Sequence, residues 1–336
     1  MNTIRQSNFE LLRIISMLMI LSLHSWMRPN ADSSISLPFY LDQVRESICL
    51  PAVNIFVLIS GYWGIKWKAR GILSLIYQVY FFVFLVYVFF VCSGLVNFSI
   101  ESLWHHANCL ILDYWFVTAY LILYLLAPVL NSFVENTMGG VKWFLIFFFC
   151  VQTYYSIYQS SPFFTGSTTM SFVGLYILGR YIHKNDAIRR ISGKYLIFGV
   201  CLLTFLETVL LVFNLKIIPS SDFARNYNSP IIIAMALCIF LMFEKISFSN
   251  KYVNIIAASS FGVYLLHMQT ELKPYYISYC ASLYNLPYWQ HIGVLLLLFV
   301  AIFVIVMLID YIRIQSFNFI CRIVKSFRFQ NNLHVN

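Results

Sequence analysis

Two ionisable side chains lie within the first apolar stretch of the chain, and their types and spacing suit them to chemistry. Arg13 is followed eleven positions later by His24, and the residues between them are all uncharged. Eleven residues make about three turns of α-helix, so both side chains project from one face, roughly 16 Å apart along the axis. A guanidinium can hold an anionic group, and an imidazole with a pKa of about 6.5 can take a proton from a hydroxyl.

Both residues also have structural alternatives. Arg13 lies near the start of the apolar stretch, where a long side chain can reach lipid headgroups, and Glu10, one turn earlier, could pair with it. His24 could be a packed histidine of the core. We interpret His24 as the main candidate for a catalytic base, with Arg13 and Glu10 completing the catalytic set.

The composition places these residues in a membrane protein. Of the 336 residues, 60% are hydrophobic and 10% are charged, against roughly 25% charged in a soluble domain. Apolar runs long enough to cross roughly 30 Å of hydrocarbon recur along the chain. We therefore predict an all-α, polytopic membrane bundle of about ten helices, forming one domain over 1–336 with no separate soluble domain. The predicted spans are residues 9–27, 48–65, 72–92, 114–131, 142–159, 169–183, 195–213, 229–244, 253–270 and 291–312.

The distribution of lysine and arginine predicts how the bundle is oriented. With the N-terminus placed in the cytoplasm, seventeen of the 22 lysines and arginines fall at inner helix ends and loops, as in membrane proteins generally. Both termini are therefore expected in the cytoplasm. The net charge of +9 is explained by a basic face beside anionic lipid, with no nucleic-acid partner. The outer residues are Arg28, Arg45, Lys216, Arg225 and Lys273.

This topology sorts the polar residues of the spans into two groups. The inner ends carry a basic set able to bind phosphate, whereas His24, Trp115 and His267 lie toward the outer side. A phosphorylated donor could enter from the cytoplasm while an acceptor waits outside. Glu207, midway along the seventh span, is a further buried ionisable group without an evident partner. Arg13, Asn131 and Lys66 lie at the inner end as well; the residues there that we predict to bind the donor, called the inner set, are Ser60, Tyr62, Lys68, Arg70 and Arg180.

The sequence does not indicate metal or soluble-enzyme chemistry. The eight cysteines are scattered without the spacing of a zinc site. The adjacent His105 and His106 have no further ligand nearby in the sequence, so no metal is predicted. No glycine-rich nucleotide motif and no GxSxG motif occurs.

Five segments, in chain order, resemble those of acyltransferase family 3, a family of membrane proteins. Its first-helix pattern, an acidic residue, Leu-Arg, ten residues and a histidine, corresponds here to the stretch from Glu10 to His24. The chain departs from the family where an Arg-x-x-Arg pair is usual, since it has Lys66-Trp67-Lys68-Ala69-Arg70. The other four segments are Phe56 to Tyr62, Asp113 to Asn131 with Trp115-Phe116 and Tyr120, Ser260 to His267, and Asp310 with Arg313.

The resemblance implies an O-acetyltransferase of the bacterial cytoplasmic (inner) membrane. Such a protein moves an acetyl group from acetyl-CoA to a sugar hydroxyl of O-antigen, capsule or exopolysaccharide, or of a lipid-linked precursor. The inner set would hold the CoA phosphates, and Trp115, Tyr120 and His267 would contact the acceptor. Two routes stay open at His24, namely proton abstraction and a transient acetyl-histidine. The expected partners are membrane lipid and a carbohydrate acceptor.

Two other classes of membrane protein compete with this interpretation. In a polysaccharide flippase or other transporter, the intramembrane Arg, His and Glu side chains would line a pathway and no bond would be made. The chain has neither duplicated halves nor a matching pair of broken helices, which are typical of transporters. A glycan polymerase of ten to twelve spans usually needs a large external loop, and the outer loops here are short. Release of CoA thiol would separate acyl transfer from both.

Overall fold

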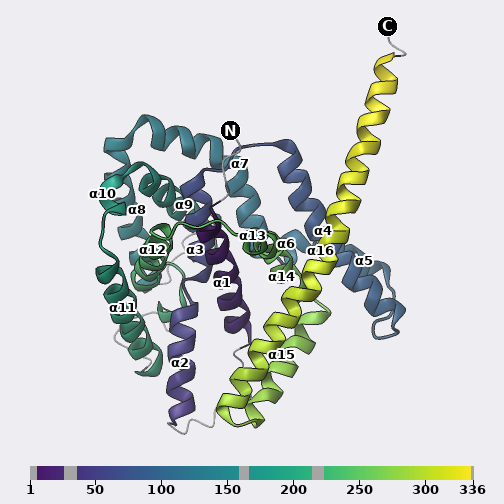
Figure 1. The fold of residues 1–336 in the computed structure, drawn as a ribbon. Helices are drawn as coiled ribbons and strands as arrows, with labels where there is room; N and C mark the ends of the chain where they lie inside the picture. Colours follow the sequence, from purple (N-terminus) through teal and green to yellow (C-terminus); the bar gives the residue numbers. More distant parts are fainter. Residues whose placement is uncertain (1–5, 26–35, 159–165, 214–222, 334–336) are drawn as a thin grey trace.

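The computed structural model describes residues 6–25, 36–158, 166–213 and 223–333, and every regular element within them is a helix (Figure 1). The predicted all-α class is confirmed. Arg28 and Lys216, used above to predict orientation, lie outside the described residues. The helices are α1 (Ser7–His24), α2 (Leu37–Cys49), α3 (Ala52–Trp63), α4 (Ala69–Cys92), α5 (Ile100–Ala107), α6 (Cys109–Leu112), α7 (Trp115–Asn136), α8 (Met138–Tyr158), α9 (Thr169–Lys184), α10 (Asp186–Arg189), α11 (Gly193–Phe213), η2 (Phe223–Arg225), α12 (Pro230–Glu244), α13 (Lys251–Ala258), α14 (Ser260–His267), α15 (Leu272–Ser282), η3 (Leu283–Asn285) and α16 (Tyr288–Leu333).

Eight helical segments of the described chain are long and apolar enough to cross a membrane, which supports a polytopic membrane bundle. They differ in how much protein surrounds them. The apolar window of α1 is 61% buried, whereas those of α11 and α16 are 22% buried. A helix surrounded by protein can carry polar side chains that lipid would not tolerate, so α1 is suited to hold a functional site. The eight are α1, α2 with α3, α4, α7, α8, α11, η2 with α12, and α16.

The two other predicted spans form shorter helices that pack inside the bundle. The span predicted at 169–183 is α9, which has 16 residues and packs against α3, α7 and α8. The span predicted at 253–270 is divided at Ser259 into α13 and α14, each of eight residues, which pack against α1. Each is shorter than the roughly 20 residues that cross the hydrocarbon core. Neighbouring helices cover them, so they need not match the thickness of the lipid.

Helices α13 and α14 run beside α1 in the same direction, and polar contacts fix them at both ends. At the start of α1, the Ser7 hydroxyl donates to the Asn254 side chain at 2.9 Å. At the other end, Nδ1 of His24 lies 2.8 Å from Nε2 of His267. The last residues of α1 and α14 are thereby brought to the same depth of the bundle.

Close packing of α3 on α9 forms a second fixed unit of the bundle. A Cβ atom on Gly61 would overlap the backbone carbonyl of Tyr176, and one on Gly179 would overlap the carbonyl of Leu58. Small residues at facing positions let two membrane helices approach until their backbones touch. The fixed position of α3 determines where its cavity-facing residues, Phe56 and Ser60, stand.

The start of α1 and the end of α16 lie at the same end of the bundle (Figure 1). This agrees with the prediction that both termini share one side of the membrane. That this side is the cytoplasm stays a prediction.

Candidate active site

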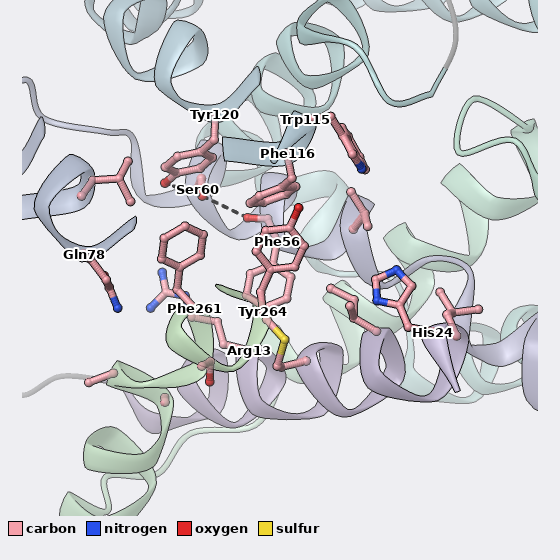
Figure 2. A pocket seen from close by; sticks show the side chains of 18 of the residues that line it. Arg13, His24, Phe56, Ser60, Gln78, Trp115, Phe116, Tyr120, Phe261 and Tyr264 are labelled. Atoms are coloured by element: carbon pink, nitrogen blue, oxygen red, sulfur yellow. Dashed lines mark hydrogen bonds between the residues drawn. The ribbon is translucent and has the colours of Figure 1, made fainter. Parts of the chain in front are cut away.

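A cavity of about 340 Å³ lies along α1 and is lined by Arg13 and His24 (Figure 2). Arg13 and His24 both project from α1 into this space, which aromatic side chains close from the opposite side. Helices α3, α4, α7, α13 and α14 supply the rest of the wall, together with Tyr227 from the turn before α12. We call this space the α1 cavity. Its lining residues are Glu10, Arg13, Met17, Ile20, Leu23, His24, Val53, Phe56, Ser60, Leu75, Gln78, Trp115, Phe116, Tyr120, Tyr227, Ala257, Ala258, Ser260, Phe261 and Tyr264.

A chain of hydrogen bonds fixes the tautomer of His24. The Nδ1 atom of His267 lies 2.6 Å from the backbone carbonyl of Val263, and a carbonyl only accepts, so this nitrogen carries the proton. In neutral His267 the other nitrogen, Nε2, is then an acceptor, and it lies 2.8 Å from Nδ1 of His24. His24 therefore donates from Nδ1, and no residue of the described chain engages the lone pair of its Nε2. Because His24 lines the α1 cavity, it can act there as a base.

Arg13 and Glu10 form an ion pair at the other end of the cavity. The distance from Arg13 Nη1 to Glu10 Oε1 is 2.6 Å, and 28% of the Arg13 side chain is exposed, against 6% for Glu10. The carboxylate lies one turn from the guanidinium on the same helix and holds it toward the cavity. Among the described residues Glu10 is its hydrogen-bond partner, so other N–H groups of the guanidinium can bind a ligand. The pairing that the sequence allowed is therefore present.

Three further predicted site residues line the same cavity. The hydroxyls of Ser60 on α3 and Tyr120 on α7 are 3.2 Å apart, which ties these two helices together at the cavity wall. Trp115, the first residue of α7, stacks on Tyr227 with ring centroids 6.2 Å apart and planes inclined by 23°. The structure thus places Trp115, Tyr120 and Ser60 with Arg13 and His24.

The remaining residues of the predicted inner set do not line the α1 cavity. Tyr62 is buried beside it, 3.4 Å from Glu244 and packed edge-on against His183. Arg180 forms an ion pair with Glu135 at the end of α7. Residues predicted as one phosphate-binding group therefore occupy separate places in the fold.

Lys68 and Arg70 line a different recess, a groove of about 360 Å³ between α4 and α16. Arg313 also faces this groove, and Arg70 donates a hydrogen bond to Asn318 at 3.0 Å. We call it the α4–α16 groove. It carries three cationic side chains, of which Arg313 is already paired with Asp310 at 2.7 Å.

A buried polar cluster that the sequence did not reveal connects the groove with the cavity. Gln78 lines the α1 cavity and donates to Asp310 at 3.2 Å. Asp310 is fully buried and pairs with Arg313 of the α4–α16 groove. An amide alone in the apolar run of α4 was the available signal for Gln78, and Asp310 with Arg313 was noted only as part of a family pattern.

Glu207 lies outside both recesses. Its side chain is completely buried on α11, and within the described chain neither carboxyl oxygen has a hydrogen-bond partner. The ion pair between Glu46 and Arg225, at 2.7 Å, lies on neighbouring elements. The structure does not connect Glu207 with the α1 cavity.

The α1 cavity combines a base, a guanidinium and an aromatic wall within a membrane bundle. This set suits the removal of a proton from a hydroxyl beside an anionic or polar ligand. A family model described as an acyltransferase domain matches residues 6–311, nearly the whole chain. No curated protein and no solved structure matches the chain.

Proposed function

Because this chain belongs to the acyltransferase family and its helices form a membrane bundle, we propose that it is an O-acetyltransferase acting on a cell-surface carbohydrate. Membership confirms the resemblance found in the sequence. The donor in this proposal is acetyl-CoA, and the acceptor is a sugar hydroxyl of O-antigen, capsule or exopolysaccharide, or of a lipid-linked precursor. The protein would lie in the bacterial cytoplasmic membrane.

The hydrogen-bonded tautomer of His24 is the observation that carries the proposal. A sugar hydroxyl is a poor nucleophile at neutral pH, and an imidazole is the side chain best suited to take its proton. In the proposed step, Nε2 of His24 takes the hydroxyl proton while the oxygen attacks the thioester carbonyl carbon. The carbon–sulfur bond then breaks, and the CoA thiolate takes the proton from His24. The products are an acetyl ester and free CoA.

The donor is proposed to enter from the end of α1 where Arg13 stands. The cavity follows α1 from Glu10 to His24, so a thin, flexible pantetheine arm could lie along it with the thioester near the imidazole. CoA carries a diphosphate and a 3′-phosphate at the other end of this arm. Lys68 and Arg70 in the α4–α16 groove are cations that could hold those phosphates.

The acceptor is proposed to bind at the His24 end, against Trp115 and Tyr227. Their stacked rings offer a flat aromatic surface, and sugar rings bind to such surfaces through their C–H faces. Tyr120, five residues after Trp115 on α7, contributes a hydroxyl that is hydrogen-bonded to Ser60 farther along the cavity (Figure 2). His267 reaches this site through His24, as its hydrogen bond indicates, rather than by lining the α1 cavity.

Release of CoA thiol tests the proposal directly. Purified protein in detergent or nanodiscs would be given acetyl-CoA with and without a glycan acceptor, and free thiol would be measured with a chromogenic disulfide. We expect release that depends on the acceptor, and a mass increase of one acetyl group on the glycan. Transport of a glycan across vesicles without thiol release would instead identify a flippase and refute the acyltransferase.

A further inference from the structure

Two side chains in the wall of the α1 cavity have hydroxyl groups whose protons meet no acceptor within the described chain, although the backbone N–H of Phe116 faces the oxygen of one of them, Tyr264. The two hydroxyl oxygens are Oη of Tyr264 and Oγ of Ser260. Both side chains are on α14, four residues apart, so they project from the same face of the helix. Tyr264 is 6% exposed and Ser260 is 2% exposed, so bulk water does not satisfy them.

Two neighbouring tyrosines contrast with Tyr264, because each donates its hydroxyl proton to a backbone carbonyl. The hydroxyl of Tyr114 donates to the carbonyl of Leu265 at 3.0 Å, and that of Tyr276 donates to the carbonyl of Leu21 at 2.8 Å. A buried hydroxyl without a partner lowers stability, and in native proteins such groups are few. Tyr264 differs from these two tyrosines because its hydroxyl proton has no acceptor in the described chain, which leaves that proton available to a bound ligand.

The ring of Tyr264 is held in place beside the imidazole pair. Its centroid lies 6.0 Å from that of His267, edge to face, and 5.7 Å from that of Phe116 on α7. Tyr264 and His267 are three residues apart on α14, so one helix positions both the donor hydroxyl and the residue that orients His24. Preorganised donors of this kind stabilise charge that develops in a transition state.

We propose that the Tyr264 hydroxyl donates a hydrogen bond to the carbonyl oxygen of the acyl thioester, with Ser260, one turn earlier on α14, as a second candidate donor. The inference rests on the proposed acyl transfer and adds a second catalytic group to it. When the acceptor oxygen attacks the carbonyl carbon, the π electrons move to the carbonyl oxygen, which becomes an oxyanion. Tyr264 keeps its proton and donates to this oxyanion. When the carbon–sulfur bond breaks, the carbonyl reforms and the thiolate takes the proton held by His24.

Tyr264→Phe separates this role from a structural one. We expect turnover to fall by roughly 10²–10³-fold, the usual cost of one oxyanion donor, while the KM for acetyl-CoA changes little. The thermal midpoint should stay close to wild type, because the variant removes a buried hydroxyl whose proton has no acceptor. Ser260→Ala tests the second hydroxyl in the same way.

Tyr114→Phe is the matched control, since it removes a neighbouring hydroxyl whose proton already has a backbone acceptor. It should lower the thermal midpoint and leave turnover close to wild type. Replacement of Tyr264 by 3-fluorotyrosine, which keeps the ring and a more acidic hydroxyl, should preserve turnover. Wild-type turnover in Tyr264→Phe would overturn the inference, as would a loss that follows a lower thermal midpoint. Absence of acceptor-dependent thiol release in the wild-type protein would overturn the proposed function itself.

Discussion

His24 presents Nε2 to the cavity because its other nitrogen is bonded to His267, which is in turn bonded to a backbone carbonyl. Histidines in active sites commonly depend on such a partner to select the tautomer. The arrangement gives each of the two histidines a different role. His24 faces the ligand space, and His267 is a positioning residue behind it.

The role of His24 can be tested by two substitutions. His24→Ala should lower turnover by roughly 10²–10⁴-fold, the usual contribution of a general base. His24→Gln should lose a similar amount, because the amide keeps the size and the hydrogen bonding but cannot take a proton. Acetylation would be measured at matched protein levels in the membrane. Near-normal acetylation in the Gln variant would exclude His24 as the base.

If His267 is a positioning residue, turnover should depend on the atom that accepts the hydrogen bond from His24 Nδ1 and not on the imidazole ring as such. His267→Leu removes the acceptor for His24 Nδ1 and should lower turnover by roughly 10–100-fold, as loss of an orienting partner does. His267→Gln places a carbonyl oxygen near the position of Nε2 and should retain more activity than Leu. The ¹⁵N chemical shifts of labelled His24 would report the tautomer in each variant. Equal losses in both variants with an unchanged tautomer would contradict the positioning role.

The sequence allowed only part of this site to be predicted. Arg13, His24 and Glu10 belong to one helix, so helical periodicity alone places them together. The bond between His24 and His267 joins residues 243 positions apart and depends on where α14 ends, which periodicity does not determine. The division of Lys68, Arg70, Tyr62 and Arg180 among separate places has the same cause, since residues at one membrane depth need not share one face of the bundle.

At the scale of helices, the contact between α3 and α9 should be sensitive to the smallest added group. Gly61→Ala forces a Cβ into the Tyr176 carbonyl and should destabilise the protein by about 1–3 kcal/mol, as overpacking does. Gly293→Ala on α16 is the control, because a Cβ there meets nothing within 4 Å and a helix gains up to about 1 kcal/mol from this change. Thermal unfolding in detergent would compare them. Equal midpoints would show that the two helices are not in close contact.

Helix α4 contributes to both recesses, since Gln78 lines the α1 cavity and Arg70 the α4–α16 groove. Lys68→Ala and Arg70→Ala should therefore raise the KM for acetyl-CoA, with each lost contact to phosphate contributing about 1.5–3 kcal/mol. Turnover at saturating donor should change little. Arg322→Ala, farther along α16, is a charge-matched control. An unchanged KM in both groove variants would show that the phosphates bind elsewhere.

Helix boundaries were the least predictable part of the fold, for identifiable reasons. The span predicted to start at residue 48 begins at Leu37, because α2 and α3 continue each other across Pro51 in one buried segment. Hydropathy at 253–270 resembles one span, yet the chain turns at Ser259. Length and hydropathy describe a helix in lipid, and they are poor guides to helices that other helices surround.

At the scale of the whole molecule, composition was sufficient to predict a helical membrane bundle, and charge bias predicts its orientation. Cysteines placed at Ser36 and Ser192 test that orientation, since Ser36 precedes α2 and Ser192 precedes α11 at opposite predicted sides. An impermeant thiol reagent applied to intact cells should label Ser36→Cys, and should label Ser192→Cys only after lysis. The unsubstituted protein reports labelling of native cysteines. The reverse labelling pattern would put the inner set outside the cytoplasm, where acetyl-CoA is absent, and would contradict the predicted orientation.

The backbone carbonyl of Val263 affects which sequence changes the histidine pair can tolerate. It accepts the hydrogen bond that ends the histidine chain, and every residue type supplies the same atom. The third group that orients the base is therefore a backbone atom, and the amino-acid sequence does not reveal it. The hydrogen bond itself would survive any substitution at position 263 that the buried site can hold, since only packing restricts the Val263 side chain. A comparison of sequences would register two histidines where three groups cooperate.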